Sequence, residues 1–177
     1  TLTLAACENG DVDFPYFDYR TVYFAYQSPV RTLILGEDTE SDNRIDNEHK
    51  CEIKATTGGG YSNPHNITIR YAVDNSMTEN LYFKENGRKV YAMPVTYYKL
   101  SSDQLEIPAG QDRGGVVVEL TQDFFNDEHA AENNYVIPLR MTHVEGADSI
   151  LSGRSLVSNP NRFIPSDWNV QPQDYIL

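Results

Sequence analysis

The sequence predicts an all-β protein with at most one or two short helical turns. Apolar and polar residues alternate over short segments such as Ile67–Asp74, and this period of two places every second side chain on one face of a strand. Turn-forming residues interrupt the pattern about every ten residues, which indicates a sandwich or a barrel. Since each strand has one apolar face, stacking two sheets into an antiparallel β-sandwich is the most economical arrangement.

The first residues are expected to lie outside the sandwich. Leu4-Ala5-Ala6-Cys7 has the form of a bacterial lipoprotein signal, in which small residues precede a cysteine that becomes lipidated. We therefore predict a signal-peptide remnant over residues 1–6, a lipid anchor at Cys7 and an acidic tether over residues 7–18. A membrane-tethered, exported protein is the expected result.

The sandwich domain is expected over residues 19–165, with strands placed by the alternation. The predicted strands are residues 20–27, 30–35, 49–56, 67–74, 95–100, 105–107, 116–120 and 134–143. The predicted core consists of Ile67, Ile69, Tyr71, Val73, Val116, Val118, Leu120, Ile137 and Leu139. Pro138 indicates an edge position or a bulge in the last strand, because proline has no N–H for pairing.

Three segments between these strands have a different character. Residues 37–48 are charged and predict a solvated loop, whereas the glycines of residues 57–64 predict a flexible turn without regular structure. Thr121 or Asp123 can cap a short helix within residues 121–131.

The C-terminal residues predict an extended segment without a core of its own. Residues 152–177 are rich in Ser, Asn, Pro and Asp and contain the only tryptophan, Trp168. We interpret residues 166–177 as an exit segment toward a possible further domain.

Length and charge restrict the class of protein. The 177 residues suffice for one ordinary domain with flanking segments. A formal net charge of -12 disfavours nucleic acid and anionic membrane surfaces, so we expect neutral or basic partners. No internal run is long and apolar enough to span a bilayer, and membrane association is expected only through the N-terminal lipid.

Cysteine and histidine usage predicts no disulfide, no metal and no cofactor. Cys7 and Cys51 are the only cysteines, and lipidation of Cys7 would leave Cys51 without a partner. Cys51 alternates with Ile53 and Ala55, which favours a small buried side chain over a reactive thiol. The histidines show no paired ligand spacing, and the acidic loop lacks the spacing of a calcium loop.

The order of several motifs resembles the domain-of-unknown-function family 1735. These motifs are Arg20–Gln27, Leu105–Gly110, Val116–Leu120, Asn134–Leu139 and Trp168–Val170. The resemblance implies an immunoglobulin-like β-sandwich at the N-terminus of exported Bacteroidetes proteins from polysaccharide-utilisation loci. In such proteins a carbohydrate-binding or glycoside-hydrolase domain follows, and the family supplies no catalytic residues.

The same resemblance implies a route of export and a modification. The acidic residues after Cys7 are similar to the tag that sends such lipoproteins to the outer face of the outer membrane. A lipid-anchored, surface-exposed outer-membrane protein is therefore expected. Asp148-Ser149-Ile150 is similar to the O-glycosylation motif of these bacteria, with Ser149 as acceptor, and a plain loop is the alternative.

We find no catalytic signature and expect no enzyme. The chitinase-type acidic motif, the Gly-x-Ser-x-Gly elbow and the phosphate loop are all absent from the sequence. Sugar sites use exposed aromatic rings for stacking, and the candidates near expected loops are Tyr61, Tyr97, Tyr98 and Trp168. The alternative is that the tyrosines occupy sheet faces and Trp168 packs at the domain boundary.

Together, these patterns predict a non-catalytic module of a cell-surface lipoprotein. Its role would be glycan capture, or that of a spacer for a downstream carbohydrate-binding domain. The possible partners are a glycan, an outer-membrane transporter and the downstream domain. The alternatives are a structural or adhesive, fimbria-like subunit and an accessory domain of a glycoside hydrolase.

Overall fold

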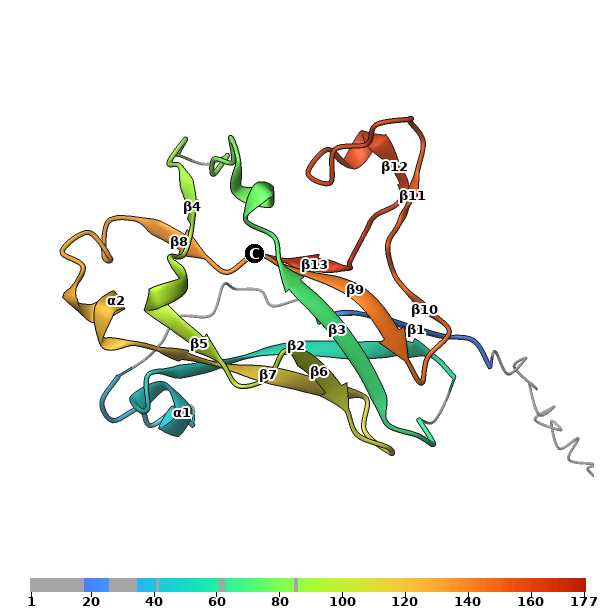
Figure 1. The fold of residues 1–177 in the computed structure, drawn as a ribbon, viewed down its shortest axis with the longest axis horizontal. Helices are drawn as coiled ribbons and strands as arrows, with labels where there is room; N and C mark the ends of the chain where they lie inside the picture. Colours follow the sequence, from blue (N-terminus) through green and yellow to red (C-terminus); the bar gives the residue numbers. More distant parts are fainter. Residues whose placement is uncertain (1–17, 26–34, 41, 61–62, 85) are drawn as a thin grey trace, which may run out of the picture.

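A computed structural model describes residues 18–25, 35–40, 42–60, 63–84 and 86–177. In this part of the chain, two curved sheets pack face to face, and short ribbons and helices extend beyond them (Figure 1). The predicted all-β, immunoglobulin-like sandwich with short helical turns is confirmed.

The first sheet has five strands in the order β10-β1-β2-β7-β5. They are β1 (Arg20–Phe24), β2 (Lys50–Gly59), β5 (Tyr98–Leu100), β7 (Arg113–Leu120) and β10 (Ser149–Ile150). The two longest strands, β2 and β7, pair antiparallel from Lys50 opposite Glu119 to Thr56 opposite Arg113. Only the edge strand β10 pairs parallel within this sheet, with β1.

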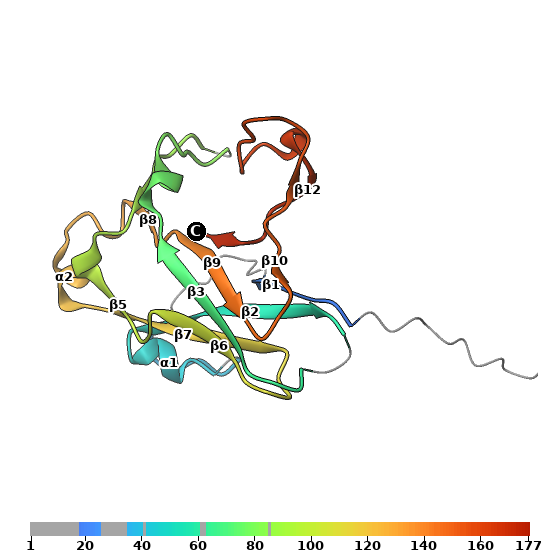
Figure 2. The same ribbon diagram turned by 45° about the vertical axis from the view of Figure 1, so that its right-hand side comes forward.

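The second sheet has four antiparallel strands in the order β13-β9-β3-β6. They are β3 (Ile67–Val73), β6 (Gln104–Ile107), β9 (Leu139–Glu145) and β13 (Tyr175–Ile176). These strands run obliquely across those of the first sheet (Figures 1 and 2). Because β13 pairs with β9, the last residues of the predicted exit segment are joined to the sandwich.

Two ribbons and five short helices complete the described part. The ribbons are β4 (Val90–Ala92) with β8 (Asn134–Val136), in parallel, and β11 (Arg154–Ser155) with β12 (Trp168–Val170), antiparallel. The helices are α1 (Arg44–Asn47), α2 (Gln122–Asn126) and the 3-10 helices η1 (Asn75–Thr78), η2 (Val95–Tyr97) and η3 (Pro165–Asp167). Among the described residues, no helix has the length and apolar character needed to cross a bilayer.

The core lies between the two sheets. Its buried members are Val22, Phe24, Ala55, Ile67, Ile69, Leu105, Ile107, Val116, Leu139 and Met141. Of the predicted core, five side chains are fully buried, namely Ile67, Ile69, Val116, Val118 and Leu139. Tyr71 and Ile137 are half-buried against the core, and Leu120 is half-buried as well.

Val73 was predicted to be in the core and is 40% exposed. The pairing of β3 with β9 shifts its register between Arg70 and Tyr71. The extra residue of this bulge is Thr142 on β9, so β3 keeps its own alternation. Tyr71 remains half-buried against the core, whereas Val73 is the last residue of β3 and is exposed, so the alternation does not lead to burial at the end of the strand.

The glycine-rich segment after Thr56 was also predicted incorrectly, because residues 57–59 continue β2 alongside β1. Gly59 has a φ of +98°, and a Cβ there would lie 1.8 Å from the carbonyl oxygen of Tyr19. A Cβ on Gly58 would lie 3.2 Å from the ring of Tyr23. Glycine is required here because the neighbouring strand approaches closely.

Three other segments differ from prediction. Residues 37–48 contain α1, within which Asp46 is buried, so this segment is not simply a solvated loop. Residues 95–97 form η2 before the short strand β5. The predicted strand 134–143 is divided at Pro138 into β8 and β9, which belong to different sheets, because proline cannot donate to continuous pairing.

Two further predictions concern residues near these segments. Cys51 lies on β2 and is half-buried rather than fully buried. The strand predicted over residues 30–35 falls outside the described residues, apart from the exposed Leu35 at its end.

Candidate functional site

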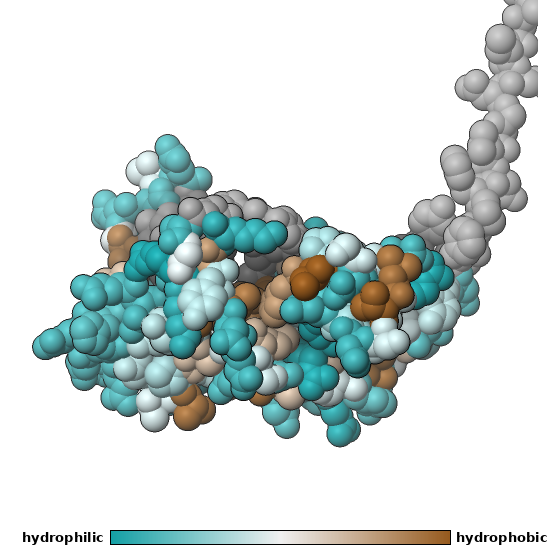
Figure 3. Space-filling model, turned by 90° about the horizontal axis from the view of Figure 1, so that it is seen from above, coloured by the Kyte–Doolittle hydropathy of each residue, from teal (hydrophilic) through white to brown (hydrophobic). Residues whose placement is uncertain are grey.

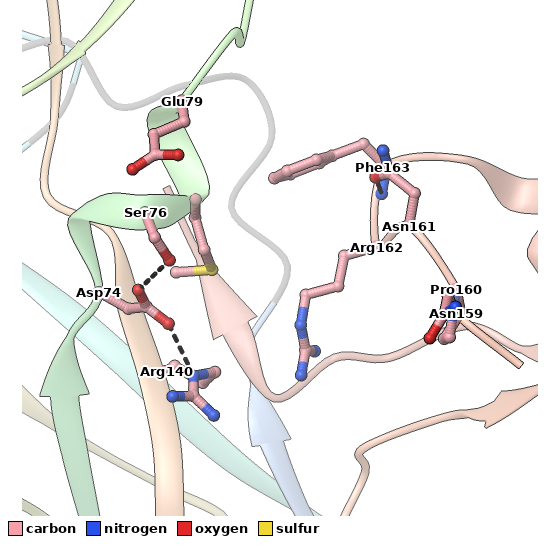
Figure 4. A pocket seen from close by; sticks show the side chains of 10 residues that line it. Asp74, Ser76, Glu79, Arg140, Asn159, Pro160, Asn161, Arg162 and Phe163 are labelled. Carbon is pink, nitrogen blue, oxygen red and sulfur yellow. Dashed lines mark hydrogen bonds and ion pairs between the residues drawn. The ribbon is translucent and has the colours of Figure 1, made fainter.

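A pocket of about 480 Å³ lies between the end of β3 and the loop that precedes η3 (Figure 4). One side, the strand wall, consists of Asp74, Ser76, Met77, Glu79 and Arg140. The other side, the loop wall, consists of residues 159–163. The surrounding face is mainly hydrophilic, with hydrophobic side chains in small separate groups (Figure 3).

The strand wall takes its geometry from the end of β3. Asp74 directly follows this strand, and its backbone N–H donates to the carbonyl of Pro138 at 2.8 Å. The Oδ2 atom of Asp74 accepts from Nε of Arg140 at 3.0 Å, and Oδ1 accepts from Oγ of Ser76 at 2.5 Å. The hydrogen bond from Ser76, followed by the charge of Arg140, lowers the pKa of Asp74 below its ordinary value.

The loop wall is held by a buried carboxylate. Asp174, which is 4% exposed, forms an ion pair with Arg162 through Oδ1 and Nη1. The guanidinium carbon of Arg162 lies 5.5 Å from the centre of the Tyr175 ring. The ring of Phe163 packs edge-on against the same tyrosine, with a centroid distance of 5.6 Å. Because Tyr175 belongs to β13, these contacts attach the loop wall to the second sheet.

Trp168 supports the loop wall from outside the pocket. Its indole Nε1–H donates to the carbonyl of Asn161 at 2.8 Å. The ring packs against Gly153, where a Cβ would come within 2.9 Å of it. The backbone N–H of Asn161 in turn donates to Asp167 at 2.8 Å. Trp168 is therefore a half-buried support for this loop and does not line the pocket.

Two other predicted stacking residues lie near α2. Tyr98 is only 7% exposed, so its ring faces are closed to a sugar, and it is removed from the candidates. The ring of Tyr97 packs edge-on against Tyr135 at 5.7 Å and Phe124 at 6.0 Å. Burial raises the pKa of Tyr97, with a smaller contribution from its hydrogen bond to Asp127. Tyr97 thus belongs to an aromatic cluster away from the pocket.

The remaining predicted sites are not tested by the structure. Cys7 and Tyr61 lie outside the described residues. Ser149 lies on β10, where its half-buried Oγ is 3.1 Å from Oγ1 of Thr21. Lipidation of Cys7 and O-glycosylation of Ser149 therefore stay predictions. Within the described residues, no group of three His, Cys, Asp or Glu side chains is arranged to hold a metal ion.

Sequence reasoning missed the two arginines of the pocket. Arg140 lies on a predicted strand, and Arg162 lies in a segment predicted only as extended. The available signal was the turn-forming stretch Asn159-Pro160-Asn161 directly before Arg162 and Phe163. Loops carry binding residues more often than the strands they connect, so a cation and an aromatic ring directly after such a turn were candidates.

Comparison with known proteins identifies the relatives of this chain. A family model described as "-like, N-terminal domain" matches residues 17–148. No curated protein matches the chain. The crystal structure of a Bacteroides ovatus protein of unknown function is 51% identical, with a TM-score of 0.85 over 90% of this chain and 51% of that chain. The present chain thus spans about half the length of that protein.

Two more distant structures also come from Bacteroides ovatus. One is described as a carbohydrate-binding protein, an assignment that is itself provisional. It is 22% identical, with a TM-score of 0.45 over 75% of this chain and 34% of that chain. The other is a multidomain protein that includes DUF1735, with 16% identity and a TM-score of 0.41 over 71% and 46% of the two chains. The predicted relationship to an N-terminal module of Bacteroides proteins is confirmed.

Proposed function

Because the chain belongs to the family whose model is described as "-like, N-terminal domain", we propose that it is a non-catalytic module of a cell-surface lipoprotein that takes part in glycan capture. The lipid anchor at Cys7 and the outer-membrane location rest on the sequence pattern alone. The 51% identical relative, of which this chain spans about half, supports a role beside a second module. An outer-membrane transporter is the further proposed partner.

The observation that carries this proposal is the combination of planar polar groups and an aromatic ring in one pocket. Asn159 and Asn161 bring amide groups, and Arg140 and Arg162 bring guanidinium groups, all suited to sugar hydroxyls. Phe163 adds an apolar ring surface for the C–H groups of a pyranose. A volume of about 480 Å³ lies within the range of small-molecule sites, roughly 300–1,000 Å³.

The carboxylates of the pocket favour binding over hydrolysis. Glycoside hydrolysis requires two carboxyl groups across the sugar, one of them an acid with a raised pKa. Asp74 has a lowered pKa and is engaged by Ser76 and Arg140. Glu79 is the other carboxylate of the pocket lining. Because the pKa of Asp74 is lowered, Asp74 does not provide the acid that hydrolysis would require opposite Glu79.

The sheet edges give less support to a fimbria-like role. In the described part of the chain, the edge strands are β10 and β5 in the first sheet and β13 and β6 in the second. Each has only two to four residues. Very short edge strands offer few backbone groups to a partner strand, so the pocket supports glycan capture better than the edges support adhesion.

Calorimetry of the protein against a panel of plant, host and microbial glycans tests the proposal. We expect binding to at least one glycan class, weakened about tenfold by Phe163→Ala or Asn159→Ala. The matched control is Phe125→Ala, a 40% exposed phenylalanine in α2, outside the pocket lining. A flat panel, or equal losses for Phe163→Ala and Phe125→Ala, would contradict this function.

A further inference from the structure

The pocket has a charge arrangement that the capture of a neutral sugar does not require. Arg140 and Arg162 lie on opposite walls, and Figure 4 shows their guanidinium groups on the two sides of the gap between these walls. Like charges that face one cavity repel each other, most strongly where water is displaced. Asp74 and Asp174 already offset much of this repulsion, and an anion placed between the guanidinium groups would bind through their remaining N–H donors.

Both guanidinium groups retain donors for such an anion. An arginine side chain carries five N–H donors. Arg140 donates through Nε to Asp74 at 3.0 Å, and Arg162 donates through Nη1 to Asp174. Within the described residues, these are the only hydrogen bonds that the two guanidinium groups donate. Both side chains line the pocket and are 41% and 27% exposed, so neither is closed off from it.

We propose that the pocket selects an anionic sugar, whose carboxylate or sulfate group is bound jointly by Arg140 and Arg162. This inference rests on the proposed function, because it specifies the class of glycan. Both anions accept paired N–H bonds from the planar guanidinium fork, and these charge-assisted bonds are about twice as strong as those to a neutral hydroxyl. Phe163 would then contact the sugar ring that carries the anion.

The acidic groups nearby leave this preference intact. Asp74 is paired with Arg140, and Asp174 is buried behind Arg162. The net charge of -12 acts over a distance, and salt at physiological strength screens exposed charges beyond about 8 Å. Glu79 is the lining carboxylate that opposes an anion directly, so Glu79→Gln should strengthen binding of an acidic sugar.

The test uses three oligosaccharides of the same length and linkage, built from galacturonic acid, sulfated galactose or neutral galactose. We expect at least one acidic oligosaccharide to bind about tenfold tighter than the neutral one. Arg140→Gln should abolish this preference, and Arg162→Lys should reduce it while keeping the charge opposite Asp174. The control is Arg70→Gln, whose 65% exposed side chain forms an ion pair with Glu145 at 3.7 Å outside the pocket.

The outcomes separate this inference from the proposed function. Tighter binding of the galacturonate or of the sulfated series supports the inference and identifies the anion. Equal affinity for all three oligosaccharides would overturn the inference and leave glycan capture standing. An acidic preference that survives Arg140→Gln, or that Arg70→Gln removes equally, would also overturn it. Absence of binding in all three series, together with a flat glycan panel, would overturn both.

Discussion

The two walls of the pocket hold the same kind of ion pair in different ways. On the strand wall, Arg140 and Asp74 are attached to strands of the second sheet and remain 41% and 23% exposed. On the loop wall, Arg162 comes from a loop, and its partner Asp174 is nearly fully buried. The strand wall is positioned by backbone pairing, whereas the loop wall depends on a few side-chain contacts.

This difference indicates where each wall is vulnerable. Strand pairing and core packing distribute the stability of the strand wall over many residues. The loop wall depends on the buried charge of Asp174, the indole of Trp168 and the ring of Tyr175. Single substitutions should therefore disturb the loop wall locally, while the strand wall should fail only together with the sandwich.

The largest effect is expected from Leu139→Ala, directly before Arg140 on β9. Leu139 is fully buried, and loss of its side chain should lower the free energy of unfolding by about 2–5 kcal/mol through lost burial and a cavity. Urea unfolding measures this change. Leu156→Ala, at a residue that is 65% exposed, is the control and should shift stability by less than about 0.5 kcal/mol. Similar losses for both variants would contradict the assignment of the strand wall to the core.

A smaller loss is expected from Asp174→Asn. Removal of one charge from a buried pair leaves the other uncompensated, which costs about 3–5 kcal/mol in a fully buried setting. Because Arg162 is 27% exposed and can gain water, we expect about 2–3 kcal/mol, or roughly 4–12 °C in Tm. Thermal unfolding of the exposed Asp103→Asn variant provides the baseline. Equal Tm values for the two variants would show that the loop wall does not depend on Asp174.

Trp168→Phe should produce a local change of about 0.5–1.5 kcal/mol, because it removes the hydrogen bond to Asn161 and keeps an aromatic ring. Hydrogen exchange should become faster in residues 159–168 and stay unchanged in β3 and β9. Faster exchange in both walls to the same extent would mean that they form one cooperative unit.

The smallest effect is expected from Asp74→Asn, because the pair with Arg140 is substantially exposed and contributes at most about 1 kcal/mol. The pKa of Asp74 is lower in the folded protein than its ordinary value of 3.8. The ionised carboxylate therefore stabilises the fold above the ordinary pKa, and this contribution is lost as pH falls through the lowered value. The difference in unfolding free energy between wild type and variant should shrink from pH 7 toward pH 2. A difference that grows on acidification would contradict this pairing.

The family model covers only one of the two walls of the pocket. Residues 17–148 include the strand wall, whereas the loop wall at residues 159–163 lies after the matched region. The sequence predictions divide the pocket in the same way, because strands were predicted up to Asp74 and across Arg140, whereas the loop wall was expected only as an extended segment. Of the predicted aromatic residues that the structure describes, Trp168 lies next to the pocket, as a support.

The sequence by itself determined the all-β class and the strands that carry Ile67, Val116 and Leu139, because alternation is a local property of the chain. It indicated an edge or a bulge at Pro138, but it did not determine that β9 bulges opposite β3 or that β8 and β9 join different sheets, since these depend on the partner strands. Only the tertiary structure brought Asp74 to Arg140, which is 66 residues away, and placed Arg162 opposite them. Contacts between distant segments leave no periodic pattern in the sequence, so a pocket built from two walls becomes visible only when the sheets are assembled.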